Sequence, residues 1–213
     1  MARPKLPRKS TNIDMTAMCD VAFLLLTFFI LATEFKPTEA VNVTTPGSVS
    51  SKPAPEKDVV LVSITKDGKV YLTMDDIERK KETIEQLNER RKLGLTEAEI
   101  AKTAALPFFG TPIGQLKAAA QLPADKYLAD GLEGIPAKDT ANNEMLDWMS
   151  AITKAYEGAK MNLLLKGDLN SKYPTLKNVI ASFKRNELLK FQMVTNPENV
   201  PVGTELYTTG ARE

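Results

Sequence analysis

The residue best placed to do chemistry is a single carboxylate, Asp20, inside a long apolar stretch. Residues 15–33 read MTAMCDVAFLLLTFFILAT and carry no other charged side chain. A charged carboxylate near the centre of a membrane helix costs about 2.5–3.5 kcal/mol or more, so such residues usually serve a function. Helical spacing puts Thr16 and Thr27, four residues before and seven after, on the face of Asp20. This stripe predicts contact with a protein partner or a water-filled seam rather than with lipid.

The apolar stretch is predicted to be a membrane-spanning helix. At about 1.5 Å per residue it reaches across the roughly 30 Å hydrocarbon core, and no later segment is as long without charge. Positive charges gather before it and not after it, which predicts a cytoplasmic N-terminus and an external position for residues 34–213. A cleaved signal peptide is the alternative. Asp20 and the lack of a good A-x-A site favour the uncleaved anchor.

Composition argues against several classes of site. The chain has no histidine, and its one cysteine, Cys19, lies in the apolar stretch. The commonest general base and the usual zinc ligands are therefore missing, and we predict no metal site, no cofactor and no enzyme activity. No Gly-rich phosphate loop follows a strand, and the net charge of +1 gives no reason to expect nucleic acid.

The rest of the chain predicts a linker and one small α/β domain. Residues 35–58 are rich in proline, and within them Val41–Thr44 alternates like a short strand, although a flexible tether fits equally well. After the linker, apolar segments with strand or helix spacing, separated by turn residues, predict an α/β fold with a mixed sheet packed by helices. The expected organisation is an N-terminus over 1–14, a transmembrane helix over 15–34, the linker over 35–58, the domain over 59–196 with an insertion at about 78–142, and a tail over 197–213.

The elements within the domain follow from local signals. Strands are expected at Val59–Thr65 and Val70–Leu72 around the turn Lys66-Asp67-Gly68-Lys69, and at Asn162–Lys166, Lys190–Thr195 and Leu206–Thr208. Helices are expected at 75–93, at 97–105 behind the capping box of Thr96, at 112–121, at 145–156, and from Pro174. The helix from Pro174 joins two strands as a βαβ unit. We expect Phe108 and Phe109 to be buried under the insertion.

Several of these segments together resemble the ExbD/TolR family. Asn12–Val21 (NIDMTAMCDV) is similar to that family's N-x-T/P-x-x-D-V pattern, and Val41–Pro46 (VNVTTP) is similar to its V-x-V-x-L-P stretch, with Thr45 in place of leucine. Leu163–Asp168 and the Tyr173-Pro174-Thr175-Leu176 segment resemble the strand, loop and helix that close the family's domain. The resemblance covers residues 10–73 and about 145–196, and the long segment 78–142 looks like that of Bacteroidetes-type members.

The resemblance implies a function and a set of partners. Asp20 falls on the family's membrane aspartate, which carries protons, and Thr16 and Thr27 are candidates for lining its path. The alternative for the two threonines is hydroxyls bonded to their own backbone. Val41, Val43 and Pro46 are candidates for a partner or strand-pairing motif. Family members work in the bacterial inner membrane as a dimer inside a ring of an ExbB-like multi-span protein, with the domain in the periplasm, and drive a TonB-like protein.

Other functions remain open on the sequence. A TolR-like role at the cell envelope is one variant of the same motor. A passive membrane-anchored binding protein is another possibility, in which Asp20 only holds helices together. The single carboxylate, without several further oxygen ligands nearby, favours H⁺ over Na⁺ as the carried ion.

Overall fold

A computed structural model describes residues 15–32, 41–49, 53–55, 57–122, 127, 129–138 and 143–201. The chain divides into two compact units, residues 1–36 and residues 37–213. In the first unit, α1 (Met15–Ala32) is one uninterrupted helix of 18 residues. It is long and apolar enough to cross a membrane, with a mean hydropathy of 2.2. The predicted N-terminal helix is therefore confirmed.

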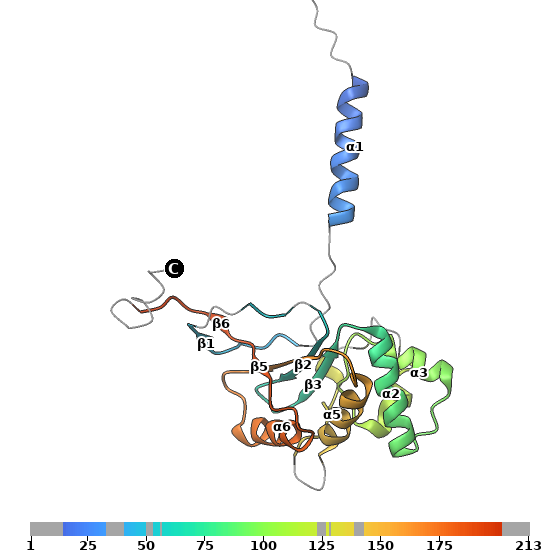
Figure 1. The fold of residues 1–213 in the computed structure, drawn as a ribbon, viewed down its shortest axis with the longest axis vertical. Coiled ribbons are helices and arrows are strands. Elements are labelled where there is room, and N and C mark those ends of the chain that lie inside the picture. The colour runs from blue at the N-terminus through green and yellow to red at the C-terminus, as the bar shows by residue number, and fades with distance from the viewer. Residues whose placement is uncertain are drawn as a thin grey trace, which may run out of the picture. The chain divides into compact units, whose positions relative to one another are not determined.

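The second unit is built on a mixed four-stranded sheet in the order β3-β2-β4-β5 (Figure 1). β2 (Val59–Ile64) and β3 (Val70–Met74) form the predicted antiparallel hairpin. β4 (Asn162–Gly167) runs parallel beside β2, and β5 (Gln192–Met193) runs parallel beside β4. The strand predicted at Lys190–Thr195 is thus present, but its ladder with β4 covers two residues only.

Three helices pack together on one face of this sheet: α2 (Ile77–Arg91), α5 (Glu144–Ala155) and α6 (Tyr173–Arg185). The predicted packing of helices on the sheet is confirmed. α2 belongs to the same layer as α5 and α6, because its side chains Ile84 and Leu87 are fully buried in the same core. The strand side chains of this face include Val60, Val62, Ile64, Val70, Leu72, Met74, Leu163 and Leu165.

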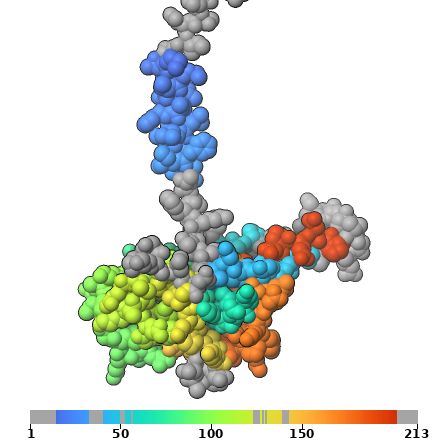
Figure 2. Space-filling view, turned by 180° about the vertical axis from the view of Figure 1, so that it is seen from behind, coloured from blue at the N-terminus to red at the C-terminus, as the bar shows by residue number. Residues whose placement is uncertain are grey.

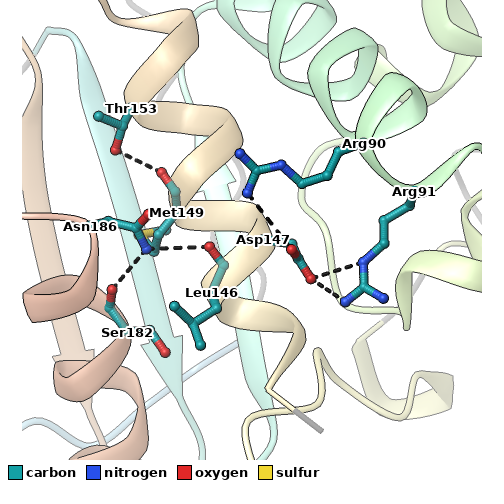
Figure 3. A network of polar contacts seen from close by, with 8 residues as sticks. All are labelled: Arg90, Arg91, Leu146, Asp147, Met149, Thr153, Ser182 and Asn186. Atoms are coloured by element: carbon teal, nitrogen blue, oxygen red, sulfur yellow. Dashed lines mark hydrogen bonds and ion pairs between the residues drawn. The ribbon is translucent and has the colours of Figure 1, made fainter. Parts of the chain in front are cut away.

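Polar contacts tie the three helices to one another (Figure 3). Asp147 of α5 forms an ion pair with Arg90, at 3.8 Å, and is also paired with Arg91, so both cations at the end of α2 converge on one carboxylate. On the other side of α5, the Asn186 amide donates to the backbone carbonyls of Leu146, at 3.3 Å, and Ser182, at 2.9 Å. These bonds fix α5 between its two neighbours.

The insertion packs on both faces of the sheet. Beyond α2, which also falls within the predicted range of 78–142, its elements are α3 (Glu97–Ala104), η1 (Ile113–Gln115), α4 (Leu116–Ala119) and η2 (Ala129–Gly131). Phe109 is fully buried on the helix face, with its ring 4.8 Å from that of Trp148. Phe108 enters a second cluster on the opposite face, with its ring 5.9 Å from that of Tyr71. The predicted burial of both phenylalanines is confirmed.

The helix predicted over 112–121 was wrong as a single element. The segment forms a 3-10 turn followed by one turn of α-helix. Gly114 weakens helix propensity there, and Gln115 at the junction adopts φ −99° and ψ 0°. The capping box of Thr96 is confirmed, since its side chain accepts from the Glu99 N–H and the Glu99 carboxylate accepts from the Thr96 N–H.

A second, two-stranded sheet joins the linker to the end of the domain. β1 (Gly47–Ser48) pairs in parallel with β6 (Asn196–Pro197). The strand considered for Val41–Thr44 is therefore misplaced, because the ladder forms three residues further on. The flexible-tether alternative also fails, because Val41 packs on the domain, where light-blue atoms lie on its surface in Figure 2, and Gly47 and Ser48 pair with β6. The strand predicted at Leu206–Thr208 lies outside the described residues.

Candidate functional site

The first candidate site is the polar face of α1. Leucine, alanine and methionine make up half of this helix, and their helix propensity favours it over a strand. Asp20 lies in its second turn and is the only formally charged residue of the 18. All of the helix except Thr27 is exposed, including the large side chains Phe23, Leu24, Phe28 and Leu31. Lipid or other protein helices must cover this surface.

The hydroxyl of Thr27 is engaged within α1. It donates to the backbone carbonyl oxygens of Phe23 and Leu24, each 3.0 Å away and one turn earlier in the same helix. This is the backbone-bonded arrangement that the sequence left open as the alternative to a path-lining role. The oxygen of Thr27 can still accept a hydrogen bond from water or a partner.

Asp20 and Thr27 share a face but do not touch. Seven residues separate them, which is about 10.5 Å along a helix axis. Leu24 lies between them and, at 100° per residue, within about 40° of Asp20 around the helix. The polar stripe is therefore interrupted by an apolar side chain. A proton moving between Asp20 and Thr27 would need water or polar groups supplied from outside this helix.

The second candidate site is the linker where it lies on the domain. The inward-facing residues alternate, as predicted: Val41 and Val43 are half-buried, Thr45 is buried at 6% exposure, and Asn42 and Thr44 are exposed. Val41 packs on the second apolar cluster around Tyr71. Residues 41–45 thus alternate between buried and exposed side chains as a strand does, although they form no hydrogen-bonded strand ladder.

Backbone hydrogen bonds fix this part of the linker at two places. The Thr44 N–H donates to the Asp168 carboxylate at 3.2 Å, and the Leu169 N–H donates to the Thr44 carbonyl at 2.8 Å. Asn196 then donates from its backbone to the Pro46 carbonyl at 3.0 Å and from its side chain to the Thr45 carbonyl at 3.2 Å. Val41, Val43 and Pro46 therefore belong to a stretch that the domain holds by hydrogen bonds, whereas Asp20 belongs to the other unit.

Two residues of this anchorage were missed by reasoning from the sequence. Asp168 also accepts from the Asn170 N–H at 2.9 Å, so its carboxylate closes a turn and holds the linker at once. A carboxylate directly after a buried strand was the available signal. Thr45 was noted as a departure from the family pattern, whereas the structure makes it the most buried residue of the described linker.

Nothing in the described part of the chain indicates a metal centre, since no three His, Cys, Asp or Glu side chains there could hold an ion together.

Comparison with known proteins places the chain among biopolymer transport proteins. The profile of the biopolymer transport protein family ExbD/TolR matches residues 7–198, which include both candidate sites. The chain is also 32% identical over 92 residues to the biopolymer transport protein exbD2 of Vibrio cholerae serotype O1. That match covers 41% of this chain and 66% of the relative. No solved structure matches it.

Proposed function

The chain belongs to the ExbD/TolR family of biopolymer transport proteins, which are not enzymes, and we propose that it is the proton-carrying subunit of an ExbB–ExbD-type motor. Such a motor converts proton motive force into mechanical work on a TonB-like protein, which drives transport across the outer membrane. The observation that carries the proposal is Asp20, the one charged side chain in an otherwise apolar helix of 18 residues.

Asp20 supplies the chemistry of this motor by binding and releasing a proton. Each charge that crosses the membrane yields about 2.3 kcal/mol per 100 mV, so repeated transfers deliver useful work. Thr16 and Thr27 lie on the same face and are proposed to accept hydrogen bonds from water on this route.

The proposed partners follow from the fact that one helix alone cannot form a proton pathway. A single helix encloses no pathway, and Asp20 is exposed on α1. We assign the surrounding helices to an ExbB-like multi-span protein and to a second copy of this chain. The N-terminus would lie in the cytoplasm and the α/β domain in the periplasm, with α1 crossing the bacterial inner membrane once.

The linker motif is proposed to transmit force between the helix and the domain. Val41, Val43 and Pro46 lie on the stretch that Asp168 and Asn196 hold by hydrogen bonds. A pull on α1 would therefore reach the ends of β4 and β5 through these bonds. The same surface is where a TonB-like partner or an exchanged strand would compete with the linker.

The test is Asp20→Asn in cells, at matched protein level, with outer-membrane uptake driven by proton motive force as the readout. Asparagine keeps the size and hydrogen bonding of aspartate but releases no proton, so uptake should fall to background while the complex still assembles. Asp14→Asn is the matched control, because it makes the same chemical change just before the helix, and it should leave uptake unchanged. Normal uptake together with an intact cell envelope in Asp20→Asn would favour the passive anchor instead.

A second readout separates the Ton-type from the Tol-type role. If the chain is a TolR-like envelope subunit, Asp20→Asn should leave uptake intact and make the cells sensitive to detergent. Loss of uptake with an intact envelope supports the ExbD-like role.

A further inference from the structure

One end of the domain presents two large apolar side chains on its surface. β2 and β4 run parallel and both end there, and the loop that joins β4 to α6 carries Leu169, while Tyr173 begins α6. These side chains are 63% and 71% exposed. The backbone of the loop is fixed, because the Leu169 N–H donates to the Thr44 carbonyl at 2.8 Å and the Ser171 N–H donates to the Asp168 carbonyl at 2.9 Å. Two exposed apolar side chains on a fixed loop favour a contact surface.

Exposed lysines accompany these two side chains. Lys172 lies between them in the sequence, Lys177 lies one helical turn after Tyr173 on the same face of α6, and Lys66 lies in the turn between β2 and β3. That turn adjoins α6, since residues 68 and 69 line one cleft with Thr175. None of the three lysines forms an ion pair with another described residue. We call this surface the basic end of the domain; it consists of Lys66, Leu169, Lys172, Tyr173 and Lys177.

The turn that carries Lys66 is held in place by the insertion. Leu72 of β3 exchanges two backbone hydrogen bonds with Phe109, at 2.8 and 2.7 Å, and the Ile135 N–H donates to the Val70 carbonyl at 2.8 Å. The insertion thus closes the outer edge of β3, directly after the turn. Lys66 is therefore carried by a hairpin whose backbone position is fixed.

The two ends of the sheet differ in charge. At the basic end, Asp67 of the β2–β3 turn is an exposed acid, and the nearby Asp168 carboxylate accepts from the backbone N–H groups of Thr44 and Asn170. The other end carries a group of acidic residues where β2 begins and β3 ends: Asp58, Asp75, Asp76 and Glu78. An anionic surface therefore attracts the basic end more than the opposite end.

The linker reaches the domain at the basic end. One cleft is lined by Val41 of the linker, by Lys66 of the turn and by Asp168 of the loop. α1 ends at Ala32, and the chain from there to Val41 spans at most about 30 Å when fully extended. A membrane crossed by α1 therefore lies within reach of the basic end.

We propose that the basic end docks on an anionic phospholipid surface, with Leu169 and Tyr173 at the level of the headgroups and the lysines against the phosphates. Tyrosine is favoured at membrane–water interfaces, because its ring is apolar and its hydroxyl can stay in water. Each basic side chain near an anionic surface strengthens the attachment by about fivefold. The inference takes from the proposed function only that α1 anchors the chain in a membrane, and it does not depend on Asp20.

Fluorescence quenching in proteoliposomes tests the docking. The full-length chain with Cys19→Ala and Asn170→Cys takes a bimane label at position 170, which is exposed in the loop after β4. The vesicles contain phosphatidylcholine, phosphatidylglycerol and a lipid with a nitroxide on its headgroup as the quencher. The label at position 170 should be quenched severalfold more strongly than a label on Ile77→Cys, because Ile77 is 64% exposed at the other end of the sheet. Flotation of the vesicles verifies that each variant is inserted.

Charge reversal gives the second measurement on the protein labelled at position 170. Lys66→Glu with Lys172→Glu replaces two attractions by repulsions, so the ratio of docked to free domain should fall by about 25-fold or more. Lys57→Glu with Lys160→Glu is the matched control, because both lysines are exposed just before β2 and β4, and it should leave the quenching unchanged. Salt at about 1 M, which shortens the Debye length to about 3 Å, should also reduce the quenching.

Three results would overturn the proposal: equal quenching at positions 170 and 77, equal quenching in vesicles without phosphatidylglycerol, or equal effects of the two double reversals. Protection of position 170 only in native membranes, and not in these vesicles, would also overturn it and would indicate a protein partner. Asp20→Asn should leave the quenching unchanged, and uptake by that variant is measured separately, so either proposal can fail alone.

Discussion

Replacing Phe109 with alanine tests whether the insertion is part of the core or only lies on it. The ring of Phe109 is fully buried and lies 4.8 Å from the ring of Trp148, which is itself fully buried. Truncation of a buried phenylalanine costs about 3–5 kcal/mol, to which the aromatic pair contributes about 0.5–1.5 kcal/mol. Alanine keeps the backbone bonds to Leu72, so the loss reports side-chain packing. We expect the free energy of unfolding to fall by about 3–5 kcal/mol.

Urea unfolding followed by tryptophan emission measures this loss directly, because Trp148 is the chain's only tryptophan. The full-length protein in detergent serves for the experiment. Leu122→Ala is the control within the insertion, since Leu122 is 45% exposed, and it should change stability by less than about 0.5 kcal/mol. A loss under about 1 kcal/mol for Phe109→Ala would contradict the packing argument. So would a tryptophan signal that stays native while the insertion becomes sensitive to protease.

Two further predictions concern the linker and a buried amine. Asp168→Ala removes the acceptor of the Thr44 N–H. Amide hydrogen exchange at Thr44 should therefore accelerate by about tenfold or more, while the urea midpoint of unfolding changes little. Unchanged exchange would mean that the β1–β6 pairing alone holds the linker. Burial lowers the pKa of Lys80 in the folded protein below its ordinary 10.5, against the opposing effect of Asp75. Between the folded and the unfolded pKa of Lys80, the unfolded chain therefore binds more protons than the folded one. In this pH range the stability of the wild-type protein should rise with pH relative to that of Lys80→Met. A stability difference between the two proteins that is flat up to pH 10.5 would refute this.

Elements with strong local signals were predictable from the sequence. The apolar run around Asp20 and the hairpin at Lys66–Lys69 each depend on neighbours in the chain, and both are confirmed. The capping box of Thr96 belongs to the same class. The strand at Asn162–Gly167 was predictable because a central strand, buried on both faces, needs a run of leucines.

Elements that depend on distant partners were less predictable. The place of β1 is set by Asn196, about 150 residues away, and no local pattern marks Gly47 as a strand residue. The role of α2 in the core rests on two buried apolar residues, Ile84 and Leu87, in a strongly charged helix, which pattern alone describes as mostly solvated. At Asp168, the carboxylate was visible in the sequence, but its contact with Thr44 depends on how the linker folds back.

The closed edge of β3 has a consequence for how large an assembly can grow. A sheet with two free edges can add copies at both ends without limit, which is the geometry of a fibre. Because Phe109 and Ile135 occupy the backbone groups of β3, strand addition to this sheet is possible from one direction only. The insertion therefore prevents this sheet from being extended by added strands at its β3 edge.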